Sequence, residues 1–279
     1  MAAREDLLDS LQMANFVADG FLRFDALVPA RLNAAALAEM ESGAVESPKR
    51  GPDATLDKAW PRNPGIRAVF SLPEIQGVIH SLVGPNPHFD HHAIHVVPPE
   101  RGIAQVWHAD NILDLRLDFD IQFFYFPHDT PREMGGTMIL PGSHYRRVSE
   151  SDIARYHNFR NQYPIVCKAG TVVVVHHGIW HCAQPNLTRR TRYMFKLRLN
   201  PTVPQRLLWD TADRDDPEIG KVLMRDHDWY GNEDRLEIVN RIRFWRFLTG
   251  DAQFDVGYFL SRLENQPATG TASAFASVS

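Results

Sequence analysis

The chain has 279 residues, of which 44% are hydrophobic and 23% charged, with a net charge of -4 at pH 7. It has no basic tract and no apolar run approaching the ~20 residues of a membrane helix, so we expect neither nucleic acid nor a membrane as its partner. The start MAAREDLLDS lacks a signal-peptide core and the chain has only two cysteines, which together predict a cytoplasmic protein without disulfides.

The first third of the chain is expected to be helical. Apolar residues recur at helical spacing in residues 4–24, with a break at Gly20, and again in residues 29–42 and 72–84. Residues 46–65 contain four prolines among turn-forming residues. We expect them to form a loop over the surface or over a pocket.

From about residue 88 the pattern changes to short β-rich runs separated by Gly, Pro, Asn and Asp. The runs are residues 88–98, 103–110, 118–126, 135–144, 163–185 and 191–201. Several short strands without regular intervening helices predict an antiparallel sandwich or barrel. The fold class is therefore mainly β with flanking helices, around a jelly-roll core (the cupin-like double-stranded β-helix).

Helical spacing returns near the C-terminus, in residues 217–229 and 233–250. The last residues are small and polar, and we expect residues 264–279 to be disordered. The predicted organisation is a β-rich domain with N-terminal helices over residues 1–210, and a helical extension over 211–263 that packs on the same domain. The extension could close a pocket or form a homodimer interface, and the sequence does not choose between these roles.

The most informative short motif is WHAD, residues 107–110. On a strand, residues two apart point to the same face, so the imidazole of His108 and the carboxylate of Asp110 can converge on one point. A pair of this kind also occurs as a simple polar pair at a sheet edge. A metal site requires a third ligand.

The third ligand should come from another strand of the same barrel. His176, His177 and His181 all lie at the end of the apolar run AGTVVVV. Two histidines and one carboxylate on one side of a metal leave adjacent coordination positions open, which suits non-haem Fe(II) oxygen chemistry rather than a closed zinc site. His181 is favoured because Arg192 follows it by eleven residues. His176 and His177 are expected to be pocket wall or to lie behind the ligands.

An organic acid bound at the open positions needs an anchor for its far end, and the planar guanidinium of arginine suits a carboxylate. Arg192 follows His181 across the turn QPNLTRRT, which predicts that it lies on the adjacent strand of a hairpin. Arg189 and Arg190 are expected to belong to a solvated basic turn. Arg198, on the same face as Arg192, is expected to lie too far along the strand.

The motifs WHAD, GGTMILPGSH and HCAQPNLTRRTR, in this order, resemble the phytanoyl-CoA dioxygenase family of Fe(II)/2-oxoglutarate-dependent oxygenases. The early DGFLRFDALVP is similar to that family's usual opening, and the resemblance spans residues 15–205. It implies that the catalytic iron is held by His108, Asp110 and His181, and that Arg192 binds the distal carboxylate of 2-oxoglutarate.

The resemblance also implies further contacts with the cosubstrate. Gln105 occupies the position three residues before the first ligand, and Thr137 occupies a position that can hydrogen-bond the keto-acid end. Some members carry a hydroxyl residue two positions after the distal histidine, where this chain has Ala183. That contact is therefore either missing or supplied by another group.

The predicted reaction uses Fe(II), 2-oxoglutarate and O2 to hydroxylate a small molecule. Asp110 argues against halogenation, because such halogenases open that coordination position with Ala or Gly. The alternative is a cupin-like metal-dependent isomerase or small-molecule binder without oxidative turnover, and a third is a degenerate member that binds a partner through its arginine-rich helix. No CoA-binding signature is present, so the substrate stays open. The histidines between His88 and His95 are expected to be scattered, although His91 and His95 share a face and could line the pocket.

Overall fold

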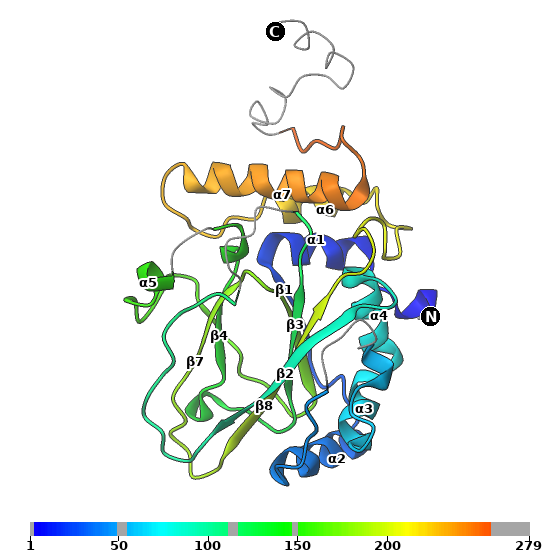
Figure 1. Cartoon of the computed structure of the whole chain (residues 1–279). Coiled ribbons are helices and arrows are strands. Elements are labelled where there is room, and N and C mark those ends of the chain that lie inside the picture. The colour runs from blue at the N-terminus through cyan, green and yellow to red at the C-terminus, as the bar shows by residue number, and fades with distance from the viewer. Residues whose placement is uncertain (1–2, 49–54, 111–116, 147–149, 258–279) are drawn as a thin grey trace, which may run out of the picture.

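The computed structural model describes residues 3–48, 55–110, 117–146 and 150–257. Eight antiparallel strands form two sheets (Figure 1). The five-stranded sheet has the order β1 (Phe21–Phe24), β6 (Thr171–His176), β3 (Ile121–Phe126), β8 (Arg192–Asn200) and β2 (His88–Val97). The three-stranded sheet has the order β5 (Tyr163–Pro164), β4 (Thr137–Leu140) and β7 (Trp180–Ala183).

The central strand β3 explains how the two layers of the core arise. Phe123 and Tyr125 pack in the larger hydrophobic cluster with the helices, whereas Phe124 and Phe126 pack between the sheets with Ile139 and Ile165. All four aromatic side chains of β3 are fully buried. Because side chains alternate along a strand, β3 contributes to both hydrophobic clusters. Burial of each Phe stabilises the fold by roughly 1.5–3 kcal/mol. Phe124 also lines the cavity described below.

Six of the seven α-helices in the described part of the chain cover the outer face and one end of the larger sheet, whereas the short helix Glu150–Ile153 lies beside the smaller sheet (Figure 1). Asp9 caps the first of them, its side chain accepting from the Gln12 backbone, and Gly20 ends it in a left-handed conformation. The helices are α1 (Ser10–Asp19), α2 (Ala30–Glu41), α3 (Pro64–Phe70), α4 (Pro73–Val83), α5 (Glu150–Ile153), α6 (Pro217–Leu223) and α7 (Glu233–Thr249).

The C-terminal helices α6 and α7 pack on α1. Trp209 and Trp245 contact each other, with ring centroids 5.8 Å apart, and Phe244 of α7 reaches the aromatic cluster at the end of β6. None of the helices in the described ranges combines the length and apolar character needed to span a bilayer. The predicted tail 264–279 and the last residues of the predicted extension lie outside the described residues.

Several local predictions were wrong, each because of a contact distant in sequence. Residues 21–24 form a strand rather than part of a helix because they pair with β6. The first C-terminal segment, predicted over residues 217–229, is helical only to Leu223, since the residues after it turn to pair with α1. Helix α3, which was not predicted, begins at Pro64 inside the expected loop.

The predicted β7–β8 hairpin was also wrong. Strand β7 pairs with β4 in the smaller sheet, whereas β8 pairs with β2 and β3 in the larger one. The turn at residues 184–191 therefore crosses from one sheet to the other. Asn186 organises this crossing, because its side-chain amide donates to the carbonyls of Val97, Pro98 and Arg190. The two strands still lie across from each other, and their inward faces enclose the site.

Candidate metal centre

The segment that carries WHAD is not a regular strand. It joins the smaller sheet through a single bridge, in which the backbone N–H of His108 donates to the carbonyl of His181 at 3.1 Å and the reverse bond measures 2.9 Å. This reciprocal pair places the two imidazoles side by side, with ring centroids 4.4 Å apart. The structure thus replaces the expected strand with one bridge to β7, which brings His108 to His181.

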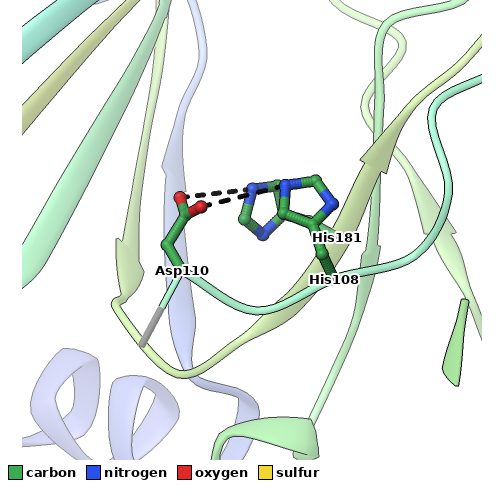
Figure 2. Close-up of side chains that lie close together, drawn as sticks. All are labelled: His108, Asp110 and His181. Carbon is green, nitrogen blue, oxygen red and sulfur yellow. Dashed lines mark ion pairs between the residues drawn. The ribbon is translucent and has the colours of Figure 1, made fainter. Parts of the chain in front are cut away.

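His108, Asp110 and His181, called the metal triad below, bring three ligand atoms within 4.8 Å of one another (Figure 2). The carboxylate oxygens of Asp110 face the two imidazoles. Oδ1 lies 3.8 Å from Nε2 of His108, and Oδ2 lies 3.6 Å from Nε2 of His181. These distances are too long for hydrogen bonds. The three atoms therefore surround a shared point without bonding to one another.

The other ring nitrogen of each histidine is already used. Nδ1 of His108 lies 2.9 Å from the carbonyl of Val106, and Nδ1 of His181 lies 3.1 Å from that of Ile179. A carbonyl only accepts, so each Nδ1 carries the proton and each Nε2 presents a lone pair toward the shared point. Burial lowers the pKa of His181 to about 4 although the carboxylate of Asp110 acts to raise it, so this imidazole is neutral near pH 7.

The carboxyl group of Asp110 is ionised. Burial alone would raise its pKa, but three causes outweigh burial and lower it: the charge of His181, which is protonated at the acidic pH where this carboxyl group titrates, the charge of Lys196 and a hydrogen bond from Lys196. Two neutral imidazoles and one carboxylate are the donor set of a 2-His-1-carboxylate centre, which leaves adjacent positions open. The residues present fit a non-haem Fe(II) ion.

The triad lines a cavity of about 110 Å³ between the two sheets. Gln105 and Thr137, which the sequence predicted for the cosubstrate, lie in its wall together with Ala183. The backbone N–H of Ala183 donates to the Gln105 side chain at 3.2 Å. Thr137 pairs directly with Ala183 across β4 and β7, so both side chains point to the same face. The predicted cosubstrate residues are thus gathered on one wall.

Arg192 does not line this cavity as it stands. It begins β8, and its Nη1 donates to the carbonyls of Met134 and Gln184 at 2.8 and 3.0 Å. Met194, two residues further on the same face, does line the cavity. Burial lowers the pKa of Arg192 to about 10, which leaves the guanidinium charged at neutral pH. Arg192 is therefore a buried cation that lies on the same strand face as Met194, just outside the cavity wall.

Two expectations concern residues near the triad. His176 and His177 do not line the cavity, so the pocket-wall role is wrong; His176 packs against Phe119 and Phe244, and His177 accepts from the backbone N–H of Asp120. Arg198 does not line the cavity either; its Nη1 donates to the carbonyl of Asp110 at 3.2 Å, and the expectation that it lies too far along to anchor the acid stays a prediction. His144 of the PGSH motif lies outside the cavity as well, and its Nε2 contacts the carbonyl of Val17 at 3.2 Å.

The sequence reasoning missed one cation at the site. The ammonium of Lys196 donates to Oδ2 of Asp110 at 2.6 Å. Lys196 lies four residues after Arg192 on β8 and therefore shares its face, so strand alternation could have found it. His95 lines the cavity, which was the alternative to the scattered arrangement expected for these histidines, whereas His91 does not. Burial lowers the pKa of His95 to about 4. His92, by contrast, stacks on Phe195 on the helix side of the sheet.

A larger hollow of about 580 Å³ lies between α6 and the end of α7. Its wall contains Lys221, Trp245 and several acidic residues, and none of the predicted site residues. It has no cluster of metal ligands among the described residues. The chemistry therefore concentrates in the smaller cavity.

The comparisons with known proteins agree with this geometry. A model of the family described as "Phytanoyl-CoA dioxygenase (PhyH)" matches residues 16–194. A search among curated proteins finds no match.

Solved structures share the fold. The carbocyclase SnoK from nogalamycin biosynthesis, a non-heme alpha ketoglutarate dependent enzyme, is 21% identical, with 72% of this chain and 87% of that chain covered and a TM-score of 0.55. The epimerase SnoN in complex with Fe3+, alpha ketoglutarate and nogalamycin RO is 16% identical (69% and 84% covered, TM-score 0.54). EvdO2 from Micromonospora carbonacea var. aurantiaca, complexed with 2-oxoglutarate, is 17% identical (70% and 91% covered, TM-score 0.51). At these identities the likeness establishes the fold, and the predicted jelly-roll class is confirmed.

Proposed function

The chain belongs to the phytanoyl-CoA dioxygenase family of Fe(II)/2-oxoglutarate-dependent oxygenases, and from this premise we propose that it hydroxylates a small molecule at the metal triad. One observation carries the proposal. The Nε2 atoms of His108 and His181 and the carboxylate of Asp110 converge, while both Nδ1 atoms are held by backbone carbonyls. A simple polar cluster would instead close its own hydrogen bonds.

In the proposed site the metal triad holds Fe(II). Iron and 2-oxoglutarate, when bound, supply the oxidative chemistry, in which O2 and the keto acid become succinate and CO2 while one oxygen atom enters the substrate C–H bond. The protein's share is to orient the ligands and to exclude water. Phe124 and Met194 supply the apolar part of the cavity wall, and Phe124 lies against His181 with ring centroids 5.4 Å apart.

The proposed role of Arg192 is to pair with the distal carboxylate of 2-oxoglutarate. Its guanidinium is buried, and a buried cation favours a carboxylate partner because little water competes. Gln105 and Thr137 hold the keto-acid end. Thr137 lies directly opposite Ala183, so its hydroxyl group replaces the one that some family members carry at the position of Ala183.

Hydroxylation is the proposed outcome, because it needs only an exposed substrate C–H bond near the metal. The neighbours include a carbocyclase and an epimerase from nogalamycin biosynthesis, so a secondary-metabolite substrate is the first class to screen. Product mass decides the reaction type: a hydroxylated product gains one oxygen atom, whereas a cyclised product loses two hydrogen atoms. A dimer through the C-terminal helices and a cytoplasmic setting stay predictions.

The test is an anaerobic visible spectrum. Adding Fe(II) and then 2-oxoglutarate to the metal-free protein should produce the weak metal-to-ligand charge-transfer band of a chelated keto acid. Asp110→Ala and His181→Ala should abolish the band, and Arg192→Met should require a higher keto-acid concentration. Arg189→Met is the matched control, because Arg189 belongs to the same turn and is almost fully exposed. Metal binding without any band would favour the cupin-like isomerase or binder instead.

A further inference from the structure

The inner face of β8 carries a row of cations toward the metal triad. Arg192, Met194, Lys196 and Arg198 alternate with residues 193, 195, 197 and 199, which pack in the core on the helix side. Successive members of the inner row are ~6.7 Å apart along the strand. The row therefore brings positive charge to both ends of the cavity, with the apolar Met194 between them.

Lys196 is the member of this row that contacts the triad. Its ammonium lies 2.6 Å from Oδ2 of Asp110, the oxygen that also faces Nε2 of His181. The side chain of Lys196 is only 11% exposed and that of Asp110 20%. Among the described residues that line the cavity, it is the only lysine or arginine. One carboxylate thus serves two positive partners, the ammonium and the metal ion that the triad is built to hold.

The charges around the triad balance before any ligand arrives. Asp110 contributes one negative charge and Lys196 one positive charge, and the two imidazoles act as neutral donors. Arg198 does not disturb this balance because it is paired with Asp120 through a hydrogen-bonded ion pair at 2.5 Å. A divalent cation that enters the triad therefore adds two positive charges to a neutral set of described side chains. With the metal bound, the site carries a net positive charge and therefore attracts anions.

We infer that Lys196 is the charge-balancing residue of the metal centre: it opposes binding of the metal alone and favours binding of an anionic ligand beside the metal. This inference rests on the proposed function, in which that ligand is the dianion 2-oxoglutarate. Arg192 receives one end of the acid, and Lys196 faces the end nearest the metal. The site then discriminates in favour of acids with two negative charges.

Lys196 has two opposing effects on the affinity of the triad for a metal ion, and one effect is larger than the other. By holding Asp110 in place, the ammonium saves the conformational entropy of a short side chain. By lying at the same carboxylate as a divalent ion, it repels that ion through a charge interaction that falls only with the inverse of distance. The repulsion is the larger effect. Removing the charge should therefore strengthen metal binding rather than weaken it.

The experiment compares two affinities in the same variants. Anaerobic calorimetry measures the binding of Mn²⁺ alone, and then of 2-oxoglutarate to the Mn²⁺-saturated protein. In Lys196→Met we expect Mn²⁺ to bind about tenfold tighter and 2-oxoglutarate about tenfold weaker, the size of one partly screened charge interaction. Lys196→Arg keeps the charge and should resemble the wild type in both. Lys168→Met is the control, since Lys168 is a surface cation paired with Asp129.

The decisive result is that the two affinities of Lys196→Met change in opposite directions, with Mn²⁺ binding tighter and 2-oxoglutarate binding weaker. A purely structural lysine would weaken both affinities when removed, and a spectator would change neither; either result overturns the inference. A variant that unfolds is recognised by its melting temperature, and the Lys196→Arg variant then still reports whether charge alone preserves both affinities. If wild-type protein binds Mn²⁺ but no 2-oxoglutarate, the proposed function fails, while tighter Mn²⁺ binding in Lys196→Met would still support the metal half of the inference.

Discussion

Two clusters of histidine and carboxylate stand out among the described residues, and they differ in how far apart their atoms are. In the metal triad the imidazole nitrogens stand 3.6 and 3.8 Å from the oxygens of Asp110. In the second cluster, formed by Asp19, His227, Glu237 and Arg241 and called the helix charge cluster here, Nε2 of His227 is 2.9 Å from Asp19 and Nδ1 is 2.7 Å from Glu237. The first cluster leaves room for a shared ion, and the second is complete.

This comparison indicates that a metal site is marked by a histidine ring nitrogen that is not hydrogen-bonded to a carboxylate, rather than by the residue types alone. Both histidines of the triad use Nδ1 on a backbone carbonyl, and the nearest hydrogen-bond partner of the His108 Nε2 is the side-chain amide of Gln105 at 3.4 Å. Both ring nitrogens of His227 lie against carboxylates, and Nδ1 also contacts Nη2 of Arg241 at 2.6 Å, so neither nitrogen is open to a metal. The helix charge cluster joins α1 to α7. Gly142 of the PGSH motif approaches it closely with φ +76°, and any side chain there would collide with Glu237 and His227.

The largest expected effect tests the structural role of the helix charge cluster. Glu237→Ala leaves the side chain of Arg241, which is 1% exposed, without its carboxylate partner. Breaking a buried pair from one side costs about 3–5 kcal/mol, so the free energy of unfolding in urea should fall by that amount. Glu233→Ala on the same helix is the control: Glu233 is half-exposed and pairs with Arg146 at the surface, so its loss should cost under about 1 kcal/mol. Equal losses would contradict the distinction.

The second-largest expected effect tests the metal triad, again by removing one member of the cluster and measuring what is lost. His181→Ala removes one of three ligands, and Mn²⁺ affinity measured by calorimetry should fall more than about 100-fold, beyond the effect of losing a supporting hydrogen bond. His227→Gln should leave Mn²⁺ affinity unchanged. A loss of metal binding in His227→Gln, or its retention in His181→Ala, would mean that the distances in the two clusters do not separate their roles.

The sequence analysis identified the three residues of the metal triad but not the backbone contacts that bring them together. The motif WHAD and the late His181 were both identified, but the convergence of His108 and Asp110 was attributed to a strand. The structure replaces that strand with one reciprocal backbone bridge to β7. Local spacing can bring residues two apart to one face, whereas a bridge to a segment some 70 residues away depends on the closed sheet.

The same limit explains the residues that were assigned wrongly. A short turn between two β-rich runs normally predicts a hairpin, but β8 pairs with β2 and β3 instead of β7. His176 is separated from the cavity because Phe244, almost 70 residues later, packs on it. Lys196 is different: its face follows from alternation with Arg192, so it was predictable and was overlooked.

The smallest expected effect is the pH dependence of the helix charge cluster. Burial lowers the pKa of His227, but its hydrogen bonds with Asp19 and Glu237 outweigh burial and raise the pKa above the ordinary value of 6.5. Stabilisation by the protonated imidazole is therefore fully present below pH 6.5 and is lost as pH rises through the raised value. Asp19 is ionised throughout this window, because its pKa is lowered despite burial by hydrogen bonds from His227 and Arg225.

The measurement is the difference in unfolding free energy between wild type and His227→Gln at about pH 6.0, 7.5 and 9.0. We expect the difference to shrink from the lowest to the highest pH, because the folded state holds the proton of His227 more tightly than the unfolded chain does. His181 does not contribute to this change, because its pKa is lowered to about 4 and it is already neutral across the window. A difference that is constant with pH would mean that His227 is held by its neutral form. In that case the two clusters would differ in distance alone and not in charge.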